Sequence, residues 1–478
     1  MFLTFYSSSA ALLTSGALVF LSLKWLSSKL RAHRAMSGIP AVGHASLLGS
    51  CVSAFEFLLD SPGFIQKGYD TYKGRAFRVP ELTHWTVVIS GGLVDEFFRL
   101  PDKTASLQDA VHEILQADYT LGRAIITNPY HIPLVHVHEE LAHVMDHGLH
   151  STTEEWVEIQ GFQLLLEAIC HASNRIFVGH PLCHNQRFVT ICVGYSKEVI
   201  KVAAVLNMFP DWIKPLLACC FKVQSYIDEA ARLLRPIIEQ RYASTRDKGN
   251  DYEGKPWLMD KAEASEQDVV GLTRRILTLN FAALHTTTLT SAHALYHIAA
   301  NPQYADEWTR SAIDRLPRLN SFLKETQRLK GSDAVISLAR KTRESLTLSD
   351  GTTIPAGTFV AVAGTAVHRD SEHFKDPLAF MPWRYMEQHG GRLGHATSED
   401  LTVTSLTHLA FGHGHTACPG RFLASLEMKL LILHLVENYN IKFAGAGERP
   451  PNKWFSVHCV PDPAARLMFR KRKAIVAA

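Results

Sequence analysis

The sequence lacks the features that divide a chain into independent parts or that mark a nucleic-acid partner. It has no long Gly/Ser/Pro linker, charge block, internal repeat or low-complexity tract, so no boundary between several domains is indicated. Lys and Arg (49) nearly balance Asp and Glu (46), and the net charge of +3 gives no electrostatic case for nucleic-acid binding. What remains is a chain of 478 residues, 46% hydrophobic and 20% charged, with enough apolar material for a large core.

Paired cysteines and a dinucleotide fingerprint are also missing. No two cysteines have the C-x-x-C spacing of zinc or redox sites. No glycine-rich nucleotide loop follows a strand, and no second domain could hold a flavin. We expect no disulfides in a long, cytoplasmic-facing chain. Seven of the eight cysteines are therefore interpreted as small core or surface residues and one, Cys418, as functional.

The first 23 residues contain no charged side chain, and their length is about that needed to cross a bilayer, roughly 20 residues. The next charged residues are all basic: Lys24, Lys29, Arg31 and Arg34. This pattern predicts a single-pass anchor over 1–23 with the rest of the chain cytoplasmic, a basic, proline-containing hinge over 24–45, and one globular domain over 46–478. A cleaved signal peptide competes with the anchor, although no Asn-x-Ser/Thr sequon occurs, and a looser interfacial helix is a further alternative.

The most informative stretch is Phe411–Gly420, F-G-H-G-H-T-A-C-P-G, in which a lone cysteine stands between two glycines. An apolar run from Phe422 to Leu435, with no Gly or Pro until Gly445, predicts a buried helix directly after it. The amides and dipole at a helix start favour a thiolate, and glycines let the backbone approach a flat ligand closely. Cys418 is therefore a metal ligand or a nucleophile.

This stretch resembles the haem-binding loop of the cytochrome P-450 monooxygenases, F-x-x-G-x-x-x-C-x-G. The residues at its fixed positions are Phe411, Gly414, Cys418 and Gly420. The resemblance implies that the loop binds haem b (iron protoporphyrin IX), with Cys418 as the axial ligand of the iron. In this family the thiolate pushes electron density to the iron and favours O–O cleavage.

A long helix is predicted over 271–300, ended by Asn301 and Pro302. On the residues alone, its centre could be a helix packed closely through Ala and Thr. Residues 282–287, A-A-L-H-T-T, resemble the family's oxygen-activation motif [A/G]-[A/G]-x-[D/E]-T-T, with His285 in place of the acid. The resemblance makes Thr286 a candidate for proton delivery. His285 could relay protons, since histidine titrates near neutrality, or it could cap a water chain or bond to a neighbouring helix.

Two further motifs stand between that helix and the cysteine loop. Glu325 and Arg328 form E-x-x-R, whose members share a helix face, and residues 380–384 read F-M-P-W-R, ending in Arg384. In the family these three residues form a buried structural triad, for which the bidentate grip of arginine on a carboxylate is suited. Arg340 matches the family's arginine that follows E-x-x-R and holds a haem propionate.

Four motifs in the family's order imply the cytochrome P-450 fold, mainly α with a small β region around one buried haem. They imply a monooxygenase that inserts one oxygen atom from O₂ into a lipophilic substrate. Electrons would come from NADPH through a membrane-bound NADPH–cytochrome P-450 reductase, with cytochrome b5 as a further partner. The A-x-H-T-T version resembles fungal members of terpenoid and related secondary metabolism. With the anchor, the expected location is the endoplasmic reticulum membrane, with the domain on the cytoplasmic side.

The sequence departs from the family pattern near the propionates. Thr416 stands where Arg or His is usual, two residues before the cysteine, and the helix motif W-x-x-x-R is not recognisable; His136 or His138 could replace it.

Two alternatives stay open: a haem-thiolate isomerase or peroxygenase that needs no reductase, and a degenerate haem protein without catalysis. The histidines over 131–150 lack the second E-x-x-H motif of a di-iron bundle and are expected on a solvated face. Residues 151–154, S-T-T-E, predict a capped helix that runs into 162–166.

Overall fold

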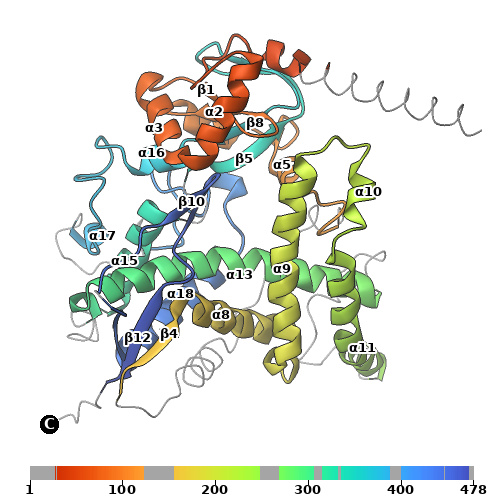
Figure 1. The fold of residues 1–478 in the computed structure, drawn as a ribbon, viewed down its shortest axis with the longest axis vertical. Coiled ribbons are helices and arrows are strands. Elements are labelled where there is room, and N and C mark those ends of the chain that lie inside the picture. Colours follow the sequence, from red (N-terminus) through yellow and green to blue (C-terminus); the bar gives the residue numbers. More distant parts are fainter. Residues whose placement is uncertain are drawn as a thin grey trace, which may run out of the picture.

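The computed structural model describes residues 27, 30–122, 155–247, 268–305, 315–331, 335–387, 400–445 and 447–472. Helices make up most of these residues, and the strands are short (Figure 1). The prediction of a mainly α fold with a small β region is confirmed.

The described helices differ widely in length, and α13 is the longest, with 32 residues. They are α2 (Leu47–Leu59), α3 (Ser61–Thr71), α4 (Leu93–Arg99), α5 (Leu107–Ile114), α8 (Gly161–Phe177), α9 (Gln186–Asn207), α10 (Lys214–Ala218), α11 (Val223–Asp247), α13 (Val269–Ala300), α15 (Arg315–Lys330), α16 (Gly364–His368), α17 (Arg384–Glu387) and α18 (Arg421–Asn438), with 3-10 turns η1 (Leu182–His184) and η4 (Gly414–Thr416).

The described strands form small sheets, and every pairing is antiparallel except that of β2 with β8. The largest sheet has the order β1 (Phe77–Pro80), β2 (Trp85–Ile89), β8 (Phe359–Val362), β5 (Ser337–Thr342), β3 (Ala105–Ser106). A second has the order β4 (Val157–Gln160), β12 (Arg466–Lys471), β9 (Tyr439–Phe443). Two hairpins pair β6 (Leu346–Thr347) with β7 (Thr353–Ile354), and β10 (Lys453–Phe455) with β11 (His458–Val460).

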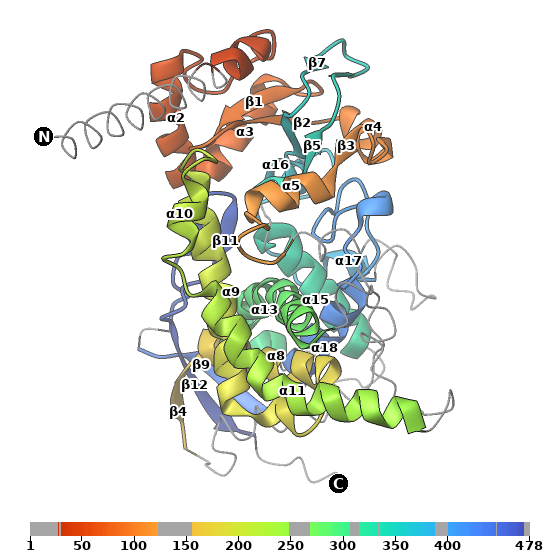
Figure 2. The same ribbon diagram turned by 90° about the vertical axis from the view of Figure 1, so that its right-hand side faces the viewer.

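Helix α13 runs through the middle of the molecule and packs against α8, α9, α11, α15 and α18 (Figures 1 and 2). Asp268 caps its start by accepting the Gly271 amide proton, and it ends at Ala300, as predicted. Every residue over 290–299 is buried, whereas Ala282 and Thr286 in the middle are exposed. Exposure on a central helix means that this part of α13 faces an internal cavity.

The helix predicted after the cysteine loop is α18, which starts at Arg421. It ends at Asn438, where the chain continues as β9, so it stops short of Gly445. The helix predicted from the S-T-T-E motif is wrong over residues 157–160, which form β4. Pairing of β4 with β12, from the far end of the sequence, overrides the local helix signal there, and α8 begins only at Gly161.

Residues 36–42 pack onto the largest sheet. Ile39 and Val42 are buried, the Val42 amide donates to the Arg78 carbonyl (3.0 Å), and the Arg78 amide donates to the Pro40 carbonyl (2.7 Å). The folded domain therefore begins ahead of the predicted boundary at residue 46. The anchor predicted over 1–23 lies outside the described residues. Within the ranges that the structure describes, no helix is both long enough and apolar enough to span a membrane.

Candidate active site

One cavity of about 1730 Å³ is lined both by the middle of α13 and by the loop 411–420. Pockets for a single small molecule are typically about 300–1,000 Å³. The cavity therefore has room for a haem-sized group and a substrate together. Among the predicted site residues, it is lined by Thr286, Phe411, Cys418 and Gly420.

Cys418 is held by its backbone on both sides. Its amide donates to the Phe411 carbonyl (2.7 Å), which closes the loop, and its carbonyl accepts from Nη1 of Arg421 (2.9 Å), the first residue of α18. The side chain is half-buried and faces the cavity. All eight cysteines lie in the described residues, and no disulfide links any of them. The loop thus presents the sulfur of its one cysteine to the cavity.

Glycine is required at two positions of this loop. Gly412 (φ +71°) and Gly414 (φ +63°) have left-handed backbone conformations, and a Cβ on Gly412 would lie 2.6 Å from the Leu338 side chain. Gly420 has an ordinary φ of −81° and is the N-cap of α18. The tight turn that was expected from the glycines therefore lies before the cysteine.

Thr286 is exposed on the cavity side of α13, and its hydroxyl donates to the Ala282 carbonyl one turn back (3.1 Å). Thr288 and Thr290 bond to their own helix in the same way. Such bonds satisfy hydroxyls inside a helix and often bend it. Because the Thr286 oxygen still has lone pairs, it can accept a hydrogen bond from a donor in the cavity.

His285 does not line the cavity. Its ring lies 6.3 Å from the Phe281 ring, and its Nε2 is buried without a hydrogen-bond partner among the described residues. Burial, and then the charge of Lys197 on α9, lower the pKa of His285 to about 4. This pKa lies below the range near neutrality that was expected for a histidine, and the surroundings of His285 fit a packing role.

Arg340, on β5, is fully buried behind the cysteine loop. Its Nη1 donates to the carbonyls of Phe97 (3.1 Å) and Leu100 (3.0 Å), and its Nη2 donates to the Thr416 hydroxyl (2.9 Å). Its Nε is buried and has no partner among the described residues. A buried donor without a partner is costly, so this guanidinium has capacity for an additional acceptor such as a carboxylate of a bound group.

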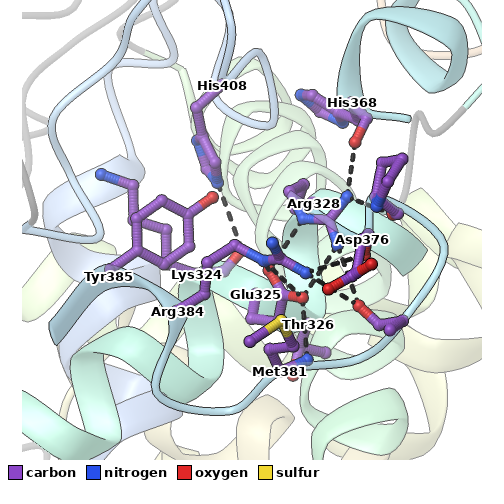
Figure 3. Close-up of polar contacts among 12 residues, drawn as sticks. Lys324, Glu325, Thr326, Arg328, His368, Asp376, Met381, Arg384, Tyr385 and His408 are labelled. Carbon is purple, nitrogen blue, oxygen red and sulfur yellow. Dashed lines mark hydrogen bonds and ion pairs between the residues drawn. The ribbon is translucent and has the colours of Figure 1, made fainter. Parts of the chain in front are cut away.

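Glu325, Arg328 and Arg384 form one buried cluster (Figure 3). Arg328 donates to both Glu325 oxygens, from Nε (2.7 Å) and from Nη2 (2.8 Å). Nε of Arg384 lies 3.1 Å from each of the same two oxygens, and the Met381 amide donates to Oε1 (3.0 Å). Both guanidinium groups also donate to backbone carbonyls. Arg328 donates to those of His368, Pro377 and Ala379, and Arg384 donates to those of Lys375, Asp376 and Ala379.

This cluster has one carboxylate for two guanidinium ions, and the backbone carbonyls stabilise the excess positive charge. The neighbouring His368 adds no further positive charge. Nε2 of His368 accepts the Leu409 amide proton (2.9 Å), and burial, followed by the charge of Arg328, lowers the pKa of His368 to about 3. Since Leu409 precedes the cysteine loop, this contact ties the cluster to the loop.

Glu427 is a cavity-lining residue that the sequence did not reveal. It lies on α18, is fully buried, accepts from the Ser173 hydroxyl with Oε1 (2.9 Å), and has no partner for Oε2 among the described residues. Burial raises the pKa of this carboxyl to about 8. A lone acid in an apolar helical run is a signal that could have pointed to it.

His136, His138 and the histidine-rich stretch 131–150 lie outside the described residues.

The residues present fit a haem. A large cavity, a fixed sulfur on one wall and a buried arginine with an unused N–H beside the loop match the size, iron and carboxylates of that group. A single cysteine and a helix hydroxyl facing one such cavity are the arrangement of a haem-thiolate oxygenase. Comparisons with known proteins agree with this class.

A model of the family described as Cytochrome P450 matches residues 120–468. "Cytochrome P450 monooxygenase 151" of Postia placenta is 37% identical, with 94% of this chain and 96% of its own length covered. "Ent-kaurene oxidase" of Gibberella intermedia is 30% identical, with 91% and 88% covered. The chain therefore belongs to the cytochrome P450 family and is a monooxygenase with haem b as its cofactor. In that family, electrons from NADPH through a reductase are standard.

The solved structure of retinoic-acid-bound cyanobacterial CYP120A1 has a TM-score of 0.62 to this chain. It covers 91% of this chain and 98% of its own, with 17% sequence identity. At that identity the likeness concerns the fold alone, and it confirms the cytochrome P450 fold that the motifs implied.

Proposed function

We propose that this monooxygenase oxidises a lipophilic, terpenoid-type substrate, with Cys418 as the iron ligand and Thr286 as the proton-donating group. The observation that carries the proposal is that Cys418 and Thr286, from two separate elements, line one cavity. "Ent-kaurene oxidase" among the relatives, at 30% identity, supports a terpenoid class of substrate.

When bound, haem supplies the reductive activation of O₂, and the protein binds the substrate and manages protons. Thr286 can accept a proton from water with its free lone pairs and, by rotating away from the Ala282 carbonyl, donate its own into the cavity. Ala282 and Ala283 keep space open beside it, because their side chains are small. Apolar residues exclude bulk water: Leu279, Phe281, Ile336, Leu338, Phe359 and Val457 line the same cavity.

Arg340 is the proposed partner of a haem propionate. Thr416 does not take over the role of the usual cation at its position; its hydroxyl accepts a hydrogen bond from Arg340. Glu325, Arg328 and Arg384 are proposed to fix the geometry of the segment that leads into the cysteine loop. No role in proton transfer is assigned to His285, because it is neutral and does not line the cavity.

An apolar stripe on α2 supports location at a membrane. Leu48, Val52, Phe55 and Leu59 recur at helical spacing on one face, and each is more than half exposed. Leu216 on α10 is also exposed, and Figure 2 shows α2 and α10 toward the same side of the ribbon. With the uncharged N-terminal segment, this face favours the endoplasmic reticulum membrane, where a reductase and cytochrome b5 would be the partners.

The test is expression in microsomes with and without reductase, followed by profiling of the products from candidate terpene substrates. The proposal predicts products that depend on both NADPH and reductase. Turnover without them would favour the isomerase or peroxygenase alternative, and haem binding without any turnover would favour the degenerate protein.

A further inference from the structure

A charged side chain lines the sheet side of the cavity and has no part in the proposed chemistry. Glu81 starts the turn between β1 and β2, and its amide donates to the His84 carbonyl (2.8 Å). Its carboxylate lines the same cavity as Cys418 and Thr286. Figures 1 and 2 show β1 in the upper part of the molecule and α13 across its middle, so the end of β1 and the middle of α13 contribute to different parts of the cavity wall.

Among the described residues, only one of the two Glu81 oxygens has partners. Oε1 accepts from the Thr86 hydroxyl (2.5 Å) and lies 3.3 Å from Nε2 of His84. Within the described part of the chain, Oε2 accepts no hydrogen bond. The Glu81 side chain is 19% exposed, and within the described residues no protein donor reaches this second oxygen.

The carboxylate is nevertheless held in its charged form. Burial alone would raise the pKa of Glu81, but His84, Thr86 and the facing His458 on β11 together lower it below its usual value. The cavity that Glu81 lines also has apolar residues in its wall, including Leu82, Ile336 and Phe359. An ionised acceptor in such a cavity favours a ligand that is mostly apolar and brings one donor.

We propose that Oε2 of Glu81 accepts a hydrogen bond from a hydroxyl on the substrate, at an end distinct from the carbon that is oxidised. This rests on the proposed function and narrows its substrate class to apolar polycyclic skeletons that already carry an O–H group. A reaction that introduces that hydroxyl must therefore precede this enzyme. The bare hydrocarbon is the poorer ligand, because it leaves the carboxylate without a donor.

Three rigid probes test this with the full-length, haem-loaded protein: 5α-androstane, 5α-androstan-3β-ol and the 3-methyl ether of that alcohol. Dissociation constants are measured by equilibrium dialysis. A hydrogen bond to a charged acceptor predicts that the alcohol binds about tenfold or more tightly than the ether, which has the oxygen but no donor. Equal binding of alcohol and ether, or no binding of the alcohol, would overturn the proposal.

Substitutions then assign the preference to Glu81. Glu81→Leu should abolish the preference for the alcohol over the ether, and Glu81→Gln, which keeps a neutral acceptor, should reduce this preference. Glu113→Gln is the matched control, since Glu113 lines the same cavity but is already paired with Lys341. An unchanged preference in Glu81→Gln would overturn the assignment even if Glu81→Leu does not fold. The reduced wild-type protein with carbon monoxide separates two kinds of failure. If it shows the red-shifted Soret band of thiolate ligation but binds alcohol and ether equally, only the Glu81 contact is rejected. If the band is missing, the proposed function itself is rejected.

Discussion

Nη2 of Arg340 donates a 2.9 Å hydrogen bond to the hydroxyl of Thr416, two residues before Cys418. The position of Thr416 in the family usually carries a cation, and here the cation reaches the loop from β5 instead. Because Arg340 also bonds to the carbonyls of Phe97 and Leu100, it joins the end of α4, the sheet and the cysteine loop. Although residue 416 is not a cation in this chain, Arg340 still places a positive charge beside the loop.

Thr416→Val removes the acceptor of this bond and leaves a buried guanidinium N–H without a partner. We expect the free energy of unfolding to fall by about 1–3 kcal/mol. We also expect faster loss of haem, followed as transfer to apomyoglobin. Thr416→Ser retains the hydroxyl and should behave like the wild type. Equal haem retention in the Val and Ser variants would show that the Arg340–Thr416 bond has no role in holding the loop.

Arg328→Met breaks the buried cluster and leaves Glu325 with fewer donors. Removing one partner of a buried ion pair costs about 3–5 kcal/mol, so little folded, haem-loaded protein is expected. Arg235→Met is the matched control, because its pair with Glu239 is exposed on α11 and such pairs contribute about 0.3–0.5 kcal/mol. Similar thermal unfolding of the two variants would contradict a structural role for the cluster.

Thr286→Ala removes the hydroxyl that is proposed to move the proton. The yield of product per NADPH should fall by on the order of 10²-fold, with reduced oxygen released as peroxide. Thr286→Ser should retain most of the coupling. Thr290→Ala removes a similar hydroxyl one turn along, which bonds to the Thr286 carbonyl, and should have a smaller effect. Full coupling in Thr286→Ala would mean that another group supplies the proton.

Glu427 predicts a pH dependence of stability. Its folded-state pKa of about 8 is above its ordinary value of 4.5, so between these values the folded protein retains a proton that the unfolded chain loses. The stability from the neutral carboxyl is therefore complete below pH 4.5 and is lost as the pH rises toward 8, by about 1.4 kcal/mol per pH unit. Glu427→Gln should flatten this slope in denaturant unfolding, whereas Glu437→Gln, at an exposed site on the same helix, should not. An unchanged slope in Glu427→Gln would place the titration elsewhere.

The sequence was sufficient where a motif is local and its chemistry is distinctive. The loop around Cys418 and the helix bearing Thr286 both form as their residue patterns indicate. The pairing of Glu325 with Arg384 could be expected only through the family resemblance, because these residues are far apart in the chain.

The remaining features depend on contacts that no local pattern encodes. The strand over 157–160 forms because β12, at the other end of the chain, pairs with it. The pKa of His285 is lowered by what packs around it, first by burial and then by the charge of Lys197 on another helix. The bond between Arg340 and Thr416, and the unused oxygen of Glu81, likewise arise only when distant segments meet.

The most direct measurement is the spectrum of the reduced protein with carbon monoxide, compared between the wild type and Cys418→Ala. If the thiolate of Cys418 binds the haem iron, the wild type shows the red-shifted Soret band of thiolate ligation and Cys418→Ala does not. Cys220→Ala, at an exposed cysteine, should leave the band unchanged. Absence of the band in the folded, haem-loaded wild type, or its persistence in Cys418→Ala, would contradict the assignment of Cys418 as the iron ligand.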